Sequence, residues 1–167
     1  MALLKLETIL FQFHARPQRD SVIENPVKIV CISDTHNCTP ALPEGDILIH
    51  AGDLSHHGSF AEIQAQLDWL RTQPHVHKVV ITGNHDLLTD AAFVDRHPER
   101  VVEKLGASAA DLNWNGLIHL NNNSISISVN DHRTIKFYGS PLTPQCGNWA
   151  FQYPPIRDVW KALDIPL

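Results

Sequence analysis

Side chains able to bind a cation follow three separate hydrophobic runs of the sequence. They are Asp34 with His36, then Asp53, then Asn84 with His85 and Asp86. Carboxylate and amide oxygens mixed with imidazole nitrogens suit Mn, Fe, Zn or Mg rather than a metal that prefers thiolates. Taken singly, each Asp or Asn is most simply a turn or capping residue. Because all three groups follow apolar runs, we favour a shared metal site over three unrelated turns.

Histidine is abundant, at 11 of 167 residues, whereas the chain has only three cysteines. Cys31, Cys38 and Cys146 are widely spaced and form no C-x-x-C pair. This pattern indicates neither a disulfide framework nor a thiolate zinc site. We therefore expect histidine chemistry in a reducing compartment, and the expected location is the cytoplasm.

The charge and hydropathy patterns exclude two kinds of partner. The 13 Lys and Arg residues are outnumbered by 18 Asp and Glu residues, for a net charge of −5, and they form no basic stripe. No nucleic-acid partner is expected on the basis of charge. The sequence also has no run of about 18 apolar residues, so no membrane partner is expected. The apolar start of the chain is interrupted by Lys5 and Glu7 and lacks a cleavage motif, which disfavours a secretory signal.

The hydrophobic patterns predict the elements that position these groups. Apolar runs of strand length cover residues 27–33, 46–50 and 78–82. Ser59 stands three residues before Glu62, the spacing of a capping box, and apolar residues at helical spacing predict a helix over residues 59–72. A helix between two strands is the connection that joins parallel strands. The carboxyl ends of the three strands, and the polar groups after them, should therefore meet at one edge of a sheet.

The rest of the chain gives weaker signals. We expect short helices over residues 91–96 and 99–105, and antiparallel hairpin strands over residues 117–120, 124–129 and 134–138. The length suits a single domain. Residues 1–26 are interpreted as an N-terminal extension, and residues 27–167 as the folded domain.

Three short motifs carry a resemblance to a known family. D-x-H stands at Asp34 to His36, G-D ends at Asp53, and G-N-H-D ends at Asp86. In this order, they resemble the calcineurin-like metallophosphoesterases. Two longer stretches, A-G-D-L-S-x-H-G and the G-S-P-x-T-P-Q-x-G-N-W-A-F-Q-Y stretch from Gly139, are similar to the metallophosphoesterase-domain proteins, some of which are cyclic-nucleotide phosphodiesterases. The resemblance implies an α/β fold, a metallophosphoesterase β-sandwich with flanking helices.

The same resemblance implies a role for each residue. Asp34 and His36 would bind one divalent metal ion, Asp53 would bridge it to a second, and Asn84 would bind the second. His85 would face the substrate and stabilise or protonate the leaving group, with Asp86 orienting its imidazole. The implied cofactors are two divalent metal ions, Mn, Fe, Zn or Mg. The implied reaction is attack of a metal-bridging hydroxide on a small phosphorylated substrate, a phosphomonoester or phosphodiester, with cyclic nucleotides among the candidates.

Two departures from the family pattern leave alternatives open. The family continues with a T-H-G-P-like block and a G-H-x-H block, and this sequence contains neither. We therefore expect the C-terminal part of the fold to be missing. The alternatives to an active hydrolase are a shortened member that binds metal or a partner with little turnover, and a fragment of a longer enzyme. His57, just beyond Asp53, would contact a phosphate or simply be solvated.

Overall fold

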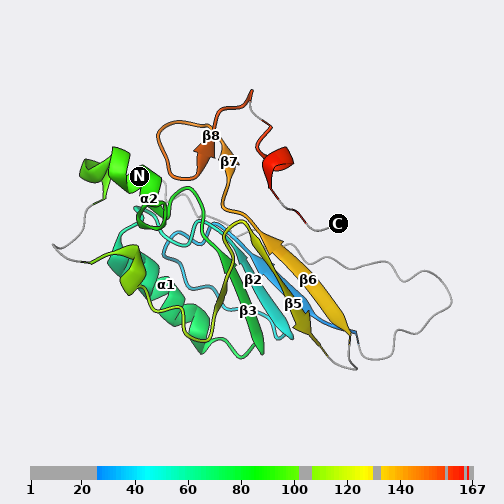
Figure 1. Cartoon of the computed structure of the whole chain (residues 1–167). Coiled ribbons are helices and arrows are strands. Elements are labelled where there is room, and N and C mark those ends of the chain that lie inside the picture. The colour runs from blue at the N-terminus through cyan, green and yellow to red at the C-terminus, as the bar shows by residue number, and fades with distance from the viewer. Residues whose placement is uncertain (1–25, 102–106, 130–132, 157, 164, 166–167) are drawn as a thin grey trace, which may run out of the picture.

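The computed structural model describes residues 26–101, 107–129, 133–156, 158–163 and 165. A four-stranded sheet with the order β1-β2-β3-β4 forms the centre of the fold (Figure 1). Its strands are β1 (Ile29–Ile32), β2 (Ile47–Ala51), β3 (His77–Ile81) and β4 (Ile118–His119), and every neighbouring pair is parallel. The three long strands confirm the runs read from the sequence, with ends that differ by one or two residues. The mixed α/β architecture that the resemblance implies is present.

Alternation along the strands gives the sheet two apolar faces. Leu48 and Val80 pack on one face against the helix α1 (Phe60–Thr72), which contributes Ile63, Leu67 and Leu70 to the largest core cluster. The predicted capping box is present: the Glu62 backbone N–H donates to the Ser59 hydroxyl, and the Glu62 carboxylate accepts the Ser59 backbone N–H. The helix therefore begins where its sequence signal places it.

The other face of the sheet is covered by a β-hairpin. Strands β5 (Asn123–Ser128) and β6 (Thr134–Gly139) pair antiparallel, as the sequence predicted. Ile127 of β5 packs with Ile47 and Val79 of the parallel sheet. The hairpin and α1 lie on opposite sides of the sheet in Figure 1, so the described part of the chain has helix, sheet and hairpin layers.

One strand direction was wrongly predicted. The segment expected to form a hairpin over residues 117–120 instead gives β4, which pairs parallel with β3 through Val79↔Ile118 and Val80↔His119. Its two residues add to the free edge of β3, so they extend the parallel sheet rather than the hairpin.

The remaining elements are short. They are the helix α2 (Ala91–Arg96), the parallel pair β7 (Thr143–Pro144) with β8 (Gln152–Tyr153), and single 3-10 turns at Leu87–Thr89, Pro98–Arg100, Ala109–Asp111 and Trp160–Ala162. The helix expected over residues 99–105 is replaced at its start by a 3-10 turn, and its residues 102–106 lie outside the described residues. The extension expected over residues 1–26 lies, apart from Pro26, outside them too. Among the described residues, none of the helices has the length and apolar character needed to span a lipid bilayer.

Candidate metal centre

The loops that follow β1, β2 and β3 meet at the carboxyl edge of the sheet. The Asp34 backbone N–H donates to the Gly52 carbonyl at 3.0 Å, and the His36 N–H donates to the Asp53 carbonyl at 3.2 Å. Asp34, His36 and Asp53 all have positive φ angles, of 53°, 42° and 54°. Non-glycine residues rarely adopt this left-handed conformation, and its strain is typical of functional sites. These backbone hydrogen bonds confirm that the loop with Asp34 and His36 lies against the loop with Asp53.

Gly83 brings the third loop against the second. A Cβ atom at Gly83 would lie 2.3 Å from Oδ1 and 2.4 Å from the backbone nitrogen of Asp53. Any side chain would collide at these distances, so glycine is the residue that permits the approach. The same approach lets the His85 backbone N–H donate to Oδ1 of Asp53 at 2.9 Å. This hydrogen bond fixes the direction of the Asp53 carboxylate.

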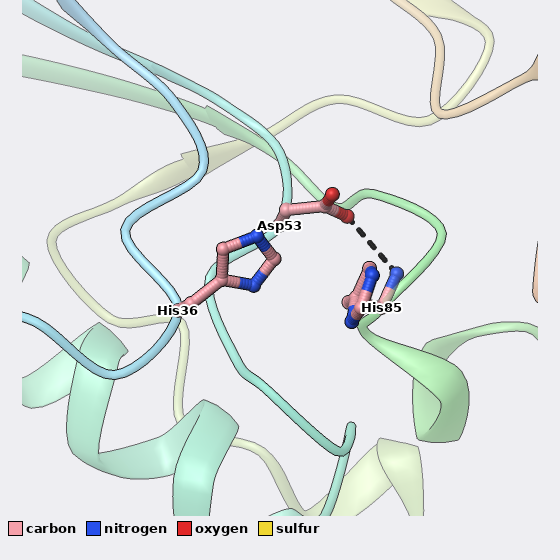
Figure 2. Close-up of side chains that lie close together, drawn as sticks. All are labelled: His36, Asp53 and His85. Atoms are coloured by element: carbon pink, nitrogen blue, oxygen red, sulfur yellow. Dashed lines mark hydrogen bonds between the residues drawn. The ribbon is translucent and has the colours of Figure 1, made fainter. Parts of the chain in front are cut away.

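Three side chains form a cluster that could hold a metal ion. One ligand atom from each of His36, Asp53 and His85 lies within 4.8 Å of the other two. Figure 2 shows both imidazole rings next to the Asp53 carboxylate, with the bond from the His85 backbone dashed. The rings of His36 and His85 meet edge to face, with centroids 4.7 Å apart.

Backbone carbonyls set the tautomers of both histidines. Nδ1 of His36 lies 3.0 Å from the Ser55 carbonyl, and Nδ1 of His85 lies 3.0 Å from the His56 carbonyl. A carbonyl can only accept, so each Nδ1 carries a proton, and in the neutral form of each ring Nε2 is the nitrogen with the lone pair. Metal-binding histidines are held in this way in proteins. The donor set of two imidazoles and a carboxylate therefore fits a divalent cation such as Zn, Mn or Fe.

The other two predicted ligands lie beside this cluster. Asp34 and Asn84 line, together with Asp53, a polar cavity of about 270 Å³ at the carboxyl edge. The cavity is closed on another side by residues that follow β6, among them Ser140 and Thr143. Asp53 therefore belongs both to the cavity and to the histidine cluster. The four residues predicted to bind metal lie at one edge, and their ligand roles stay predictions.

Asp86 does not have the contact expected of it. Its buried carboxylate accepts hydrogen bonds from the Ser55 hydroxyl at 2.6 Å, and from the backbone N–H groups of Ser55, Gly83 and Leu54 at 2.9, 2.8 and 3.2 Å. Burial raises the pKa of Asp86, and these hydrogen bonds act in the opposite direction. The carboxylate thus joins the second loop to the third, whereas the His85 ring is oriented by the His56 carbonyl.

The neutral His50 supports the loop after β1 through hydrogen bonds. The Gly52 N–H donates to Nδ1 of His50 at 3.3 Å, so the His50 proton is on Nε2, which lies 2.9 Å from the Thr35 hydroxyl. That hydroxyl in turn lies 3.3 Å from Oε1 of Gln66 on α1. Burial lowers the pKa of His50 to about 4, with an opposing contribution from Asp34. His50 is fully buried inside its strand and has a structural role.

Glu62 connects the same loop to the histidines after β2. Oε1 accepts a 2.7 Å hydrogen bond from the Asn37 side chain, and Oε2 accepts the His57 N–H at 3.2 Å. A residue expected only to cap the helix therefore also holds two loops. The His57 side chain is exposed and stacks edge to face on His56, and its proposed contact with phosphate stays a prediction.

Sequence reasoning missed two neighbours of the cluster. The His56 ring lies 5.8 Å from that of His36 and 6.2 Å from that of His85, and the Trp149 ring stacks on His85 at 4.0 Å. The adjacent His56-His57 pair was a usable signal for the first. Trp149, by contrast, is 64 residues from His85 (149 − 85), and the stretch from Gly139 that contains it gives no sign of a contact with His85.

Comparison with known proteins places these features in a family. The family model described as calcineurin-like phosphoesterase matches residues 27–161. Metallophosphoesterase domain-containing protein 1 of Homo sapiens is 34% identical over 137 residues, which cover 76% of this chain and 41% of the relative. A UPF0046 protein of Caenorhabditis elegans is 35% identical over 151 residues, or 87% of this chain and 52% of the relative.

A third relative has a different printed name. "Probable rhamnogalacturonate lyase C" of Emericella nidulans is 43% identical over 136 residues, which cover 81% of this chain and only 12% of that protein. The chain thus spans about half the length, or less, of these curated relatives. The family model covers most of the chain, and its match includes all three strand-end motifs, so the chain belongs to the calcineurin-like phosphoesterase family.

Proposed function

We propose that this chain is a metal-dependent phosphoester hydrolase whose centre lies at the carboxyl edge of the parallel sheet. The observation that supports this most is the cluster of His36, Asp53 and His85, whose ligand atoms lie within 4.8 Å of one another. Membership of the calcineurin-like phosphoesterase family supplies the reaction class. The proposed substrates are small phosphomonoesters or phosphodiesters, with cyclic nucleotides as one class.

Four residues are proposed to hold two divalent cations. Asp34 and His36 would bind the first, Asn84 would bind the second, and Asp53 would contact both. The geometry that supports this is the position of Asp53 between the histidine cluster and the polar cavity. When bound, divalent cations polarise the phosphoryl oxygens and neutralise the charge that develops on them.

His85 is proposed to act on the leaving group. Its Nδ1 is engaged by the His56 carbonyl, so Nε2 is the ring nitrogen left for the substrate, and in the doubly protonated ring Nε2 would donate its proton to the departing oxygen. Its backbone is joined to Asp53, so ligand and acid are held at a fixed spacing. Asp86 would maintain this spacing by holding the Gly83 and Ser55 backbones together.

A second candidate is a metal-binding chain with little turnover. The observation that favours it is that, among the described residues, one cluster of three side chains, His36, Asp53 and His85, is close enough together to share a metal ion. Both candidates require the same metal centre, and they differ only in hydrolysis.

The test counts metal ions and measures hydrolysis in parallel. The chain would be loaded with Mn²⁺ and assayed on bis(p-nitrophenyl) phosphate, alongside Asp53→Asn and the control Asp68→Asn on the exposed surface of α1. We expect Asp53→Asn to lose metal and to reduce hydrolysis by more than about 100-fold, because removing even a supporting partner costs about 10- to 100-fold. The control should match the parent chain. Bound metal without hydrolysis would favour the second candidate, and hydrolysis unaffected by Asp53→Asn would contradict the first.

A further inference from the structure

Trp149, in the connection between β7 and β8, lies against the histidine cluster. Its ring stacks on the His85 imidazole with centroids 4.0 Å apart and planes inclined by 27°. This is a face-to-face contact, and it differs from the edge-to-face contact that His85 makes with His36. The indole therefore covers one face of the proposed acid.

The backbone holds Trp149 in this place. The N–H of Ala150 donates to the Asn84 carbonyl at 3.2 Å, and the N–H of Phe151 donates to Oδ2 of Asp90 at 2.7 Å. Ala150 is fully buried in a small core cluster with Leu87. The segment around Trp149 is thus joined to the loop that carries His85 on both sides of that histidine.

Arg100 restrains the indole itself. Its guanidinium carbon lies 5.2 Å from the centre of the Trp149 ring, within the range of a cation–π interaction. One guanidinium nitrogen also donates to the Asn148 carbonyl at 2.9 Å. The Arg100 side chain therefore contacts both the ring and the backbone beside it.

We propose that Trp149 is a positioning residue that holds the His85 imidazole with Nε2 facing the metal centre. The inference rests on the proposed function for its catalytic meaning, because His85 acts there as the acid. The hydrogen bond from Nδ1 to the His56 carbonyl fixes one edge of the imidazole. A second contact is needed to stop the ring from turning about this hydrogen bond. Stacking on a rigid, backbone-anchored indole provides it, since ring pairs favour this offset arrangement.

The chain contains a matched pair for comparison. Trp114 stacks on His119 with centroids 3.9 Å apart and planes inclined by 6°, and neither residue belongs to the histidine cluster. The variants are Trp149→Ala, the conservative Trp149→Phe, and the control Trp114→Ala. Each is first checked for a cooperative thermal melt, and Trp149→Phe keeps the test valid if Trp149→Ala fails to fold.

The first readout is the NMR signal of the ring protons of His85, measured without metal and identified by its loss in His85→Gln. An indole stacked over the imidazole shifts these protons upfield. We expect a downfield move in Trp149→Ala, a smaller one in Trp149→Phe and none in Trp114→Ala, which should shift His119 instead. A His85 signal unchanged by both Trp149 variants, or moved equally by Trp114→Ala, would overturn the proposal.

The second readout is the affinity for Zn²⁺, measured by calorimetry. His85 is the proposed acid and not one of the four proposed ligands, so Trp149→Ala and Trp149→Phe should both keep the Zn²⁺ affinity within about twofold of the parent value. A loss of Zn²⁺ binding in Trp149→Ala as large as that in Asp53→Asn would count against positioning of the acid. The NMR readout needs neither metal nor turnover, so a chain that hydrolyses nothing would refute the proposed function while still deciding the role of Trp149.

Discussion

The middle of β2 and the loop after its carboxyl end have very different surroundings. Along its length, Leu48 packs against Ile63, Leu67 and Leu70 of α1, all three of which are fully buried. Just beyond its carboxyl end, Asp53 has a left-handed backbone and a partly exposed side chain. The packed region, formed by β2 and α1, follows ordinary backbone and burial preferences and stabilises the fold. The loop edge, formed by the loops after β1, β2 and β3, departs from these preferences and carries the candidate metal site. Changes in the first should alter the unfolding free energy, and changes in the second should alter metal binding.

The largest expected effect is on the packed region. Leu67→Ala should lower the free energy of unfolding by about 2–5 kcal/mol, because it leaves a cavity in the largest core cluster. Urea unfolding would measure it, and Mn²⁺ affinity of the folded variant should stay within about twofold of the parent value if the two regions are separate. Val76→Ala is the control, since Val76 is 77% exposed and its loss should cost less than about 0.5 kcal/mol. Equal losses would contradict the assignment of the core.

An intermediate effect is expected where the two regions meet, at His50. Its pKa of about 4 in the folded chain lies below the value of 6.5 of an unperturbed histidine. As the pH falls below 6.5 the unfolded chain binds a proton first, so stability is complete above pH 6.5 and decreases towards pH 4. The total loss is about 3 kcal/mol.

The comparison with His50→Gln isolates this contribution. Urea unfolding of the metal-free chain at pH 7, 6 and 5 gives the free energy of unfolding at each pH. This free energy should fall less steeply with decreasing pH in His50→Gln than in the parent chain. The window from pH 6.5 to 5 matters most, because carboxylates titrate below it. Parallel slopes for the two proteins would show that His50 is not held neutral by burial.

Of these three substitutions, the one at Gly83 is expected to change stability least and metal binding most. A Cβ atom there would force Asp53 to move, and overpacking of this kind costs about 1–3 kcal/mol. We expect Gly83→Ala to weaken Mn²⁺ binding by about 10-fold or more, as measured by calorimetry.

Gly116→Ala is the matched control for Gly83→Ala. Gly116 has a φ of +79°, and a Cβ atom there would meet nothing within 4 Å among the described residues beyond its chain neighbours. Only stability should therefore change in this variant. Unchanged Mn²⁺ binding in Gly83→Ala would contradict the claim that changes at the loop edge alter metal binding.

The packed region could be predicted closely because its signals are local. Ser59 and Glu62 stand at capping-box spacing, and the structure has that box and the helix that it begins. The direction of β4 could not be predicted in the same way. The four-residue run over residues 117–120, which is apolar except for His119, carries no direction, and its pairing depends on the edge of β3 being free to accept it.

The loop edge could be predicted only as a set of residues. The motifs predicted a common location for Asp34, His36, Asp53 and Asn84, and the structure brings them to one edge. The metal-binding roles of these four residues stay predictions.

The contact of Asp86 was wrongly predicted because neighbours in sequence point in different directions in a tight turn. The Asp86 N–H donates to the Gly83 carbonyl, and this turn directs the carboxylate inward to Ser55. The G-N-H-D motif places Asp86 next to His85 in the sequence, but the motif alone does not show which way each side chain leaves the turn.

The long separation between His85 and Trp149 gives the centre an order of assembly. Ribosomes add about 5–20 residues per second, so the 64 residues between these two (149 − 85) take about 3–13 seconds to synthesise. His36, Asp53 and His85 all leave the ribosome before the indole exists. The stacking of Trp149 on His85 is therefore the last contact of this group that can form, because it waits for the synthesis of the stretch that follows β6.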